Sequence, residues 1–151
     1  ATPATAAFQS VAGTAVRGAR FAGEDGAEAP DGPYRIGYLQ DLVLDVELVV
    51  PPQHRNVTLS LGVFDRELQG IGECAQRRDA PLRNTGAPLR ARITLPRINL
   101  SRGAYTLTLG VTCADTGLVL ARFPSVRAVL VTGDHPMWAP VHFESCFEQM
   151  R

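Results

Sequence analysis

Residues 91–113 contain two runs of alternating apolar and polar side chains, and these runs restrict the folds open to the chain. The first run places apolar residues at every second position: Ala91, Ile93 and Leu95. The second run does the same with Tyr105, Leu107, Leu109, Val111 and Cys113. A period of two puts alternate side chains on opposite faces of a strand, whereas a helix would scatter them around its axis. Pro96 and Gly103 bound a connection that continues neither strand. We therefore expect two strands that feed one core, with the rest of the chain supplying the other layer.

Further runs with the same period predict the remaining strands. The clearest is 34–50, which ends at Pro51 and Pro52. The next is 55–64, in which four apolar residues share one face: Val57, Leu59, Leu61 and Val63. A returning strand loosened by two glycines follows at 68–75, and two more strands are expected on either side of Pro124, at 118–123 and 125–132. A weak first strand within 8–21 would direct four residues inward: Val11, Ala15, Ala19 and Phe21.

About eight short strands at turn spacings of about 8 to 12 residues, without a helical segment, predict an all-β fold, an antiparallel β-sandwich. A jelly roll is favoured over an immunoglobulin-like sandwich, because the Cys…Trp…Cys order of immunoglobulin domains is missing. The length of 151 residues suits a single domain over 8–151. Residues 1–7 are expected to be a linker, which suggests a piece of a longer protein, and residues 134–151 form an apolar tail.

The charge and cysteine content argue against several classes of protein. Fifteen basic and fifteen acidic residues balance to a net charge of zero, so the chain lacks the electrostatic footprint of a nucleic-acid binder. Three widely spaced cysteines, Cys74, Cys113 and Cys146, predict buried or half-buried thiols in a reducing cytoplasm instead of a disulfide framework. No apolar run reaches the roughly 20 residues of a membrane span, and the N-terminus has no signal-peptide pattern.

The residues that could carry catalysis are few and scattered. Three histidines, His54, His135 and His142, lack the spacing of a metal site. Three acids around one hairpin could converge as the carboxylate pair of a glycosidase, namely Asp65, Glu67 and Glu73, but charged hairpin tips are commonplace. There is no phosphate-binding loop and no nucleophile elbow. We therefore expect no enzyme activity, no cofactor and no metal.

A binding surface is the remaining possibility. The strand 57–64 alone combines hydroxyl groups with an aromatic ring on its outward face: Thr58, Ser60, Gly62 and Phe64. An aromatic ring supplies a flat apolar platform for a sugar, and Gly62 leaves a gap beside Phe64 where a ring could lie. Outward residues of other strands extend this surface if they share its sheet: Arg90, Arg92, Thr106 and Thr108. The alternative is that Phe64 is a core residue at a strand end, and that the threonines reflect ordinary β-propensity.

The chain also resembles a known family. The sequence LSRGAYTLTLGV contains the pattern Leu-x-x-Gly-x-Tyr at Leu100, Gly103 and Tyr105. Five further elements occur in a fixed order around it, over roughly residues 34–140. They are a strand before a proline-containing loop, the sequence NVTLSLGVFD, a glycine-rich returning strand, a last strand ending in Val-x-Gly, and a Trp-containing tail. This order resembles the C-terminal carbohydrate-binding domain of the ATPase subunit in Wzt-type O-antigen polysaccharide ABC exporters.

The resemblance implies a non-catalytic module that binds O-antigen polysaccharide and couples its recognition to export by the ABC transporter. The implied partners are the polysaccharide, an N-terminal ATPase domain in the full-length chain, and a second copy in a homodimer that exchanges C-terminal strands. The apolar tail residues Trp138, Phe143 and Phe147 would form that dimer contact. The implied location is the cytoplasmic face of the inner membrane, with membrane contact only through the transporter. Two alternatives remain: a structural or oligomerisation sandwich without a ligand, and an accessory module of a secreted glycosidase.

Overall fold

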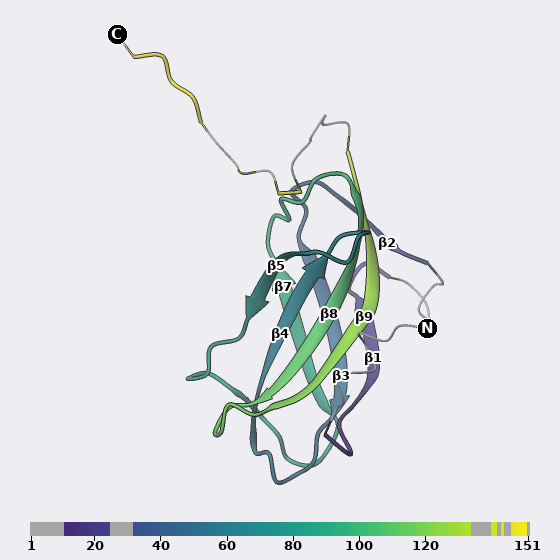
Figure 1. Ribbon diagram of the computed structural model, residues 1–151, viewed down its shortest axis with the longest axis vertical. Helices are drawn as coiled ribbons and strands as arrows, with labels where there is room; N and C mark the ends of the chain where they lie inside the picture. The colour runs from purple at the N-terminus through teal and green to yellow at the C-terminus, as the bar shows by residue number, and fades with distance from the viewer. Residues whose placement is uncertain (1–10, 25–31, 134–139, 142, 144–145, 151) are drawn as a thin grey trace.

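Two sheets packed face to face form the body of the computed structural model, which describes residues 11–24, 32–133, 140–141, 143 and 146–150 (Figure 1). The smaller sheet has the order β1-β3-β7, where β1 is Ala15–Phe21, β3 is Leu42–Val49 and β7 is Leu89–Leu95. The larger sheet has the order β2-β9-β8-β4-β5, and its strands are β2 (Tyr34–Gly37), β9 (Val119–Thr132), β8 (Gly103–Cys113), β4 (Asn56–Phe64) and β5 (Gly70–Ala75). A short β6 (Leu82–Arg83) pairs with β4. Strand pairing is antiparallel except between β2 and β9. The predicted all-β sandwich is therefore confirmed. No helix that could cross a membrane occurs among the described residues.

The core lies between the sheets and consists of the apolar sets that the alternation predicts. The buried side chains of β3, β4 and β8 are Leu42, Leu44, Val46, Leu48, Val57, Leu59, Leu61, Val63, Tyr105, Leu107, Leu109, Val111 and Cys113. In the inward set of β7, Leu89 is buried and Ala91, Ile93 and Leu95 are half-buried, because β7 is the last strand of its sheet. Burial of these faces is the main stabilising contribution to the fold.

The run 34–50 forms two strands instead of one. Leu39 has a φ of 64°, and the side chain of Gln40 accepts a hydrogen bond from the backbone N–H of Gly37 at 2.8 Å. This turn sends β2 to the edge of the larger sheet and β3 to the centre of the smaller one. The interruption is a tight turn inside an apolar run, which the period alone does not reveal.

The two strands within residues 91–113 lie in opposite sheets, so they do not form one layer as expected from the sequence. Their connection crosses the end of the sandwich and is held by the turn before β3. There the backbone N–H of Ile98 donates to the carbonyl of Gln40 at 2.8 Å, and the carboxylate of Asp41 accepts from the N–H of Arg97 at 2.9 Å. The connection therefore belongs to the sandwich end and does not form a hairpin.

Bulges account for two further differences. The strand β9 continues through Pro124, because the register with β8 shifts there and Ser125 adopts a φ of 52°, so the missing proline N–H falls in the bulge. In β1 the register shifts between Val16 and Gly18. Ala15, expected to point inward, is therefore exposed, while Val16 packs against the core. In β5 a bulge is present opposite Val63, as the glycines predict.

The Leu-x-x-Gly-x-Tyr pattern has a structural explanation. Tyr105 is buried at the start of β8, and its hydroxyl donates a hydrogen bond to the carbonyl of Ser101 at 2.7 Å. This is the tyrosine corner known from immunoglobulin-like sandwiches, in which the ring fixes the chain that enters a strand. Leu100, also buried, anchors the start of the same corner.

Replacing Tyr105 with phenylalanine should lower the free energy of unfolding by about 1 to 3 kcal/mol. The substitution keeps the ring in the core but leaves the buried carbonyl of Ser101 without its partner. Chemical denaturation of both proteins would measure the difference. A Thr106→Val variant, altered one residue away on the outer face, should change stability much less; an equal loss in both would argue against the corner.

Arg127 and Glu24 close the side of the sandwich next to β1. The guanidinium of Arg127 contacts both carboxylate oxygens of Glu24, at 2.6 and 2.7 Å, and donates to the carbonyl of Ala19 at 3.1 Å. The same guanidinium lies 4.6 Å from the ring centre of Phe21, which stacks on Tyr34. The two charged side chains are only 10% and 2% exposed. A buried ion pair thus replaces apolar packing at this edge.

Candidate functional site

The outer face of the larger sheet brings five of the predicted site residues together. β4 and β8 are neighbours, and their register pairs Ser60 with Gly110, Gly62 with Thr108, and Phe64 with Thr106. Outward side chains of paired residues lie next to one another on the same face. Ser60, Phe64, Thr106 and Thr108 therefore share one surface, with Thr58 at its end. Thr58 is only 8% exposed and offers little of its side chain to a ligand.

The Phe64 ring lies on this face next to two glycines. A Cβ atom built on Gly62 would be 3.1 Å from Cε2 of the ring, and one built on Gly70 would be 3.7 Å from Cε1. The ring therefore lies between the two glycines, and the gap expected beside Gly62 is filled by Phe64 itself. Because Val63 points into the core, Phe64 belongs to the outer face and is half-buried there.

Small residues form a strip next to the Phe64 ring. Ser60 is paired with Ala75 on one side and Gly110 on the other, and Gly110 is paired with Arg122. A Cβ atom at Gly110 would come within 2.3 Å of the Ser60 hydroxyl oxygen, so this strip depends on glycine. The result is a low strip across β5, β4 and β8, perpendicular to the strands, which ends at Arg122 on β9. We call the surface of Ser60, Gly62, Phe64, Thr106, Thr108 and Gly110 the Phe64 face.

Arg90 and Arg92 do not belong to the Phe64 face. They lie on β7, in the other sheet, so their side chains project from the opposite side of the sandwich. From the sequence, Arg90 and Arg92 were expected to extend the binding surface only if their strand shared a sheet with Phe64. In the structure, their strand lies in the other sheet. The register between β3 and β7 places Arg92 opposite Asp45 and Arg90 opposite Glu47.

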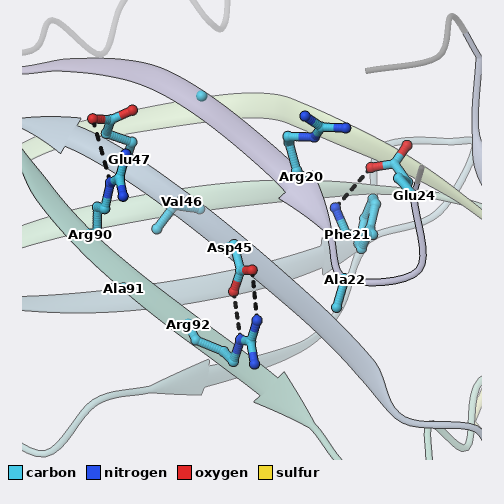
Figure 2. Close-up of a pocket in the computed structure, with 11 residues that line it drawn as sticks. Arg20, Phe21, Ala22, Glu24, Asp45, Val46, Glu47, Arg90, Ala91 and Arg92 are labelled. Atoms are coloured by element: carbon cyan, nitrogen blue, oxygen red, sulfur yellow. Dashed lines mark hydrogen bonds and ion pairs between the residues drawn. The ribbon is translucent and has the colours of Figure 1, made fainter. Parts of the chain in front are cut away.

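The outer face of the smaller sheet contains a depression of about 570 Å³ (Figure 2). Arg92 forms a two-pronged ion pair with Asp45, with distances of 2.7 and 2.9 Å, and its hydrogen bonds lower the pKa of the Asp45 carboxyl. Arg90 approaches Glu47 only to 3.7 Å. Sequence reasoning missed the two acids. The alternation in 41–50 directs both outward, but no local pattern indicates that β7 is their neighbour.

The third surface is an apolar slit on the side of the sandwich where β5 and β7 end their sheets. Two adjoining cavities of about 490 and 330 Å³ lie there, and Leu61 and Cys74 line both. Most of the other lining side chains are aliphatic, including Leu59, Val63, Ile71, Ala91, Ile93 and Leu95. Val141 of the tail also lines the slit, next to its bridge partner Leu100. We call this surface the edge slit.

The tail leaves the sandwich after Val141 with its aromatic side chains exposed. Phe143 is 77% exposed, Phe147 92% and Met150 90%. Trp138, the other residue expected in a dimer contact, lies outside the described residues.

One of the three cysteines does not have the burial that the sequence predicted. Cys113 is buried, and a hydrogen bond from Thr116 is the main cause that lowers the pKa of its thiol to about 7. Cys74 is half-buried, and burial raises the pKa of its thiol. Cys146 is exposed, so the prediction of three buried or half-buried thiols is wrong there. In the part of the chain that the structure describes, no three His, Cys, Asp or Glu side chains are grouped to hold a metal ion.

Comparison with known proteins adds one likeness of fold. No protein-family model matches the sequence, and no curated protein matches it. Among solved structures, the crystal structure of the C-terminal domain of Wzt superposes with a TM-score of 0.73 and 14% sequence identity, covering 94% of this chain and 87% of that one. The chain has the fold of the Wzt C-terminal domain. The resemblance expected from the Leu-x-x-Gly-x-Tyr region is thus confirmed in three dimensions, over the whole sandwich.

Proposed function

We propose that this domain binds a polysaccharide without cleaving it, through the Phe64 face. The observation that supports this most is the Phe64 ring, which lies on the outer face of the sheet between Gly62 and Gly70, with Thr106 opposite it. A ring held in this way offers its outer side to the apolar face of a sugar. Its conformation is set by the sheet, so binding costs little side-chain entropy.

The surroundings of the ring suit a sugar polymer. The hydroxyl groups of Ser60, Thr106 and Thr108 can both donate to and accept from sugar hydroxyls. An exposed sheet face is open at both ends, unlike a deep pocket, so a long chain can lie across it. The strip of small residues beside Phe64 leaves room for the next sugar unit.

A binding role without catalysis agrees with the acids near this face. The carboxylate of Asp65 accepts hydrogen bonds from the backbone N–H groups of Glu67 and Gln69, at 3.0 and 2.8 Å, and so holds the turn after β4. Asp65 therefore has a structural role, and of the three acids of this hairpin the register places Glu73 on the Phe64 face, opposite Gly62. We propose no cofactor and no metal for this domain.

We further propose that the domain acts in the export of O-antigen polysaccharide by an ABC transporter. The support is the fold shared with the Wzt C-terminal domain and the order of sequence elements in the chain. In that setting the domain works at the cytoplasmic face of the inner membrane, joined to an ATPase domain, and couples glycan recognition to export. A structural module without a ligand and an accessory module of a glycosidase are the alternatives.

Titration of the domain with the polysaccharide of its own bacterium tests the proposal. We expect saturable binding with a dissociation constant on the order of micromolar to millimolar, without release of new sugar ends. Phe64→Ala should abolish measurable binding. Its loss of stability should be smaller than the loss of about 3 to 5 kcal/mol that follows removal of a fully buried ring.

Phe64→Leu is the matched variant. It keeps apolar contact with Gly62 and Gly70 but removes the flat ring, so stability should stay near that of the wild type while binding is lost. Unchanged binding by Phe64→Leu would exclude the ring as platform. Absence of saturable binding in the wild type would favour the structural alternative, and hydrolysis of the glycan would contradict a binding-only role.

We also propose that the domain forms a homodimer in which the tail of one copy occupies the edge slit of the other. Val141 already lines this slit. In an extended tail, Phe143 and Phe147 would point to the same side as Val141, because their separations from it are even. The four residue steps from Phe143 to Phe147 span about 13 Å of extended chain, which is the segment that would lie in the partner's slit. The slit edges β5 and β7 would then gain a strand partner.

A further inference from the structure

Strand pairing adds one carboxylate to the Phe64 face. Glu73 is the only charged residue in β5, β4 and β8, three strands that the structure describes in full. The register pairs Glu73 with Gly62, whereas the next residue, Cys74, pairs with the buried Leu61. Because alternate side chains lie on opposite faces of a strand, Glu73 projects from the outer face of the sheet. A carboxylate therefore shares the surface of the aromatic ring.

The carboxylate of Glu73 is open to a ligand. Glu73 is exposed, and no group among the described residues forms a hydrogen bond or ion pair with its carboxylate. By contrast, Asp65 in the same hairpin accepts two backbone hydrogen bonds, and Glu24 is bound by Arg127. The nearest arginine that strand pairing places on this face is Arg122 on β9. It lies three strand spacings from β5, about 14 Å across the sheet.

The Phe64 ring reaches toward the row of residues that contains Glu73. Strand pairing forms this row from Glu73, Gly62 and Thr108 across β5, β4 and β8. A Cβ atom on Gly62 would lie 3.1 Å from Cε2 of the Phe64 ring, so the edge of the ring lies beside the middle of the row. The Cα atoms of Glu73 and Thr108 are two strand spacings apart, about 9.5 Å. A carboxylate and a hydroxyl group therefore flank the ring on either side of β4.

The low strip of small residues adjoins this row. Ala75, Ser60 and Gly110 pair across the same three strands, and their side chains project little from the sheet. A sugar unit that contacts the Phe64 ring can extend over this strip, where its hydroxyl groups come within reach of Glu73. A carboxylate has two acceptor oxygens, and its charge strengthens each hydrogen bond that it accepts. It can therefore accept from two neighbouring hydroxyl groups of one sugar.

The same charge disfavours acidic sugars. A uronate would bring a second negative charge beside Glu73, and β4, β5 and β8 contain no cation to offset it. We propose that Glu73 selects the ligand of the Phe64 face: a neutral sugar unit that donates two neighbouring hydroxyl groups to the carboxylate, with anionic sugars excluded. This inference rests on the proposed function of the Phe64 face and names the class of sugar that it binds.

Titration of the ¹⁵N-labelled domain with matched sugars tests the role of Glu73. D-glucose, D-galactose and D-mannose are each compared with the uronate that has a carboxylate at C6, and amide chemical shifts are the readout. At least one neutral sugar should shift the signals of Ser60, Gly62, Glu73 and Thr108, with a dissociation constant on the order of millimolar. Its uronate should bind about tenfold more weakly or worse. Added salt should narrow this difference, because it screens the repulsion between the two negative charges.

Glu73→Gln keeps the size of the side chain but removes its charge. It should weaken binding of the neutral sugar about tenfold and remove the preference over the uronate, because the hydrogen bonds lose their charge assistance. Glu67→Gln is the matched control, since Glu67 is an exposed acid in the turn of the same hairpin. This control should change neither the binding of the neutral sugar nor the preference.

The outcomes separate this inference from the proposed function. If Phe64→Leu abolishes sugar binding but Glu73→Gln leaves it unchanged, the Phe64 face binds sugar and Glu73 has no part in selecting it. A uronate that binds as well as its neutral sugar would also overturn the inference. If none of these sugars shifts the signals of the face, the inference is overturned, and titration with the polysaccharide decides separately whether the proposed function stands.

Discussion

Replacing Arg127 with methionine is expected to lower the free energy of unfolding by about 3 to 5 kcal/mol at neutral pH. The substitution leaves the Glu24 carboxylate buried, 2% exposed, without the guanidinium that now contacts both of its oxygens. It also removes the hydrogen bond to the carbonyl of Ala19 and the cation over the Phe21 ring. Urea denaturation of the two proteins at pH 7 would measure the loss.

The loss should depend on pH in a defined direction. Hydrogen bonding from Arg127 is the main cause that lowers the pKa of Glu24 in the folded protein. Because the folded-state pKa is lowered, the ion pair stabilises the protein at pH values above the unfolded-state pKa of about 4.3. This stabilisation is lost as the pH falls through the folded-state pKa. In the methionine variant the buried carboxyl is instead stabilised by protonation. The difference between the two proteins should therefore shrink as the pH falls from neutral through the unfolded-state pKa of about 4.3.

Two matched variants separate the ion pair from simple loss of arginine. Arg92→Met removes an exposed two-pronged arginine–carboxylate pair, whose side chains are 63% and 44% exposed, so the loss of stability should be far smaller than for Arg127→Met. The double variant Glu24→Leu with Arg127→Met removes both charges and should recover much of the loss. If Arg92→Met and Arg127→Met cost the same, burial would not be the reason for the effect.

The alternation of apolar residues was sufficient to predict which face of each strand is buried. The inward sets of β4 and β8 are those expected from the sequence, and Phe64 with its neighbours faces outward for the same reason. A period of two is a local property, since it depends only on the geometry of one strand. The sandwich follows because every strand has one apolar face.

Strand partners were not predictable in the same way. β7 and β8 are neighbours in sequence but lie in opposite sheets, which separates Arg90 and Arg92 from Phe64. The pairing of Arg127 with Glu24 joins residues more than 100 positions apart, and nothing in either local sequence indicates it. Pairing depends on which apolar faces meet when the sheets close, so it is decided by the whole chain.

Bulges and side-chain conformations were also hidden from the sequence. A bulge shifts the phase of a strand without changing its composition, as between Val16 and Gly18, so the inward residue moves by one. At Gly62 the sequence indicated the free space, but the ring that fills it is that of Phe64. Both effects depend on the neighbouring strand, which the local sequence does not contain.

Deletion of the tail after Val141 is expected to convert the proposed homodimer fully into a monomer. The deletion keeps the contacts that Pro140 and Val141 make with their own chain, through the N–H of Ser101 and the bridge to Leu100. It removes Phe143 and Phe147, whose exposed side chains have no packing within the chain in the described structure. Light scattering at several concentrations would measure the mass of both forms.

A peptide of residues 140–151 tests where the tail binds. Added to the shortened domain, it should bind and shift the amide signals of Ile71, Cys74 and Ile93, which line the edge slit. A peptide with Phe143→Ser and Phe147→Ser should not bind, because burial of each ring contributes about 1.5 to 3 kcal/mol. A shortened chain that remains a dimer of unchanged stability would exclude the tail as the dimer element. If the peptide binds at the Phe64 face instead, the tail is still a docking segment, but the edge slit is not its binding site. The aliphatic side chains that β5 and β7 leave open would then have no part in assembly.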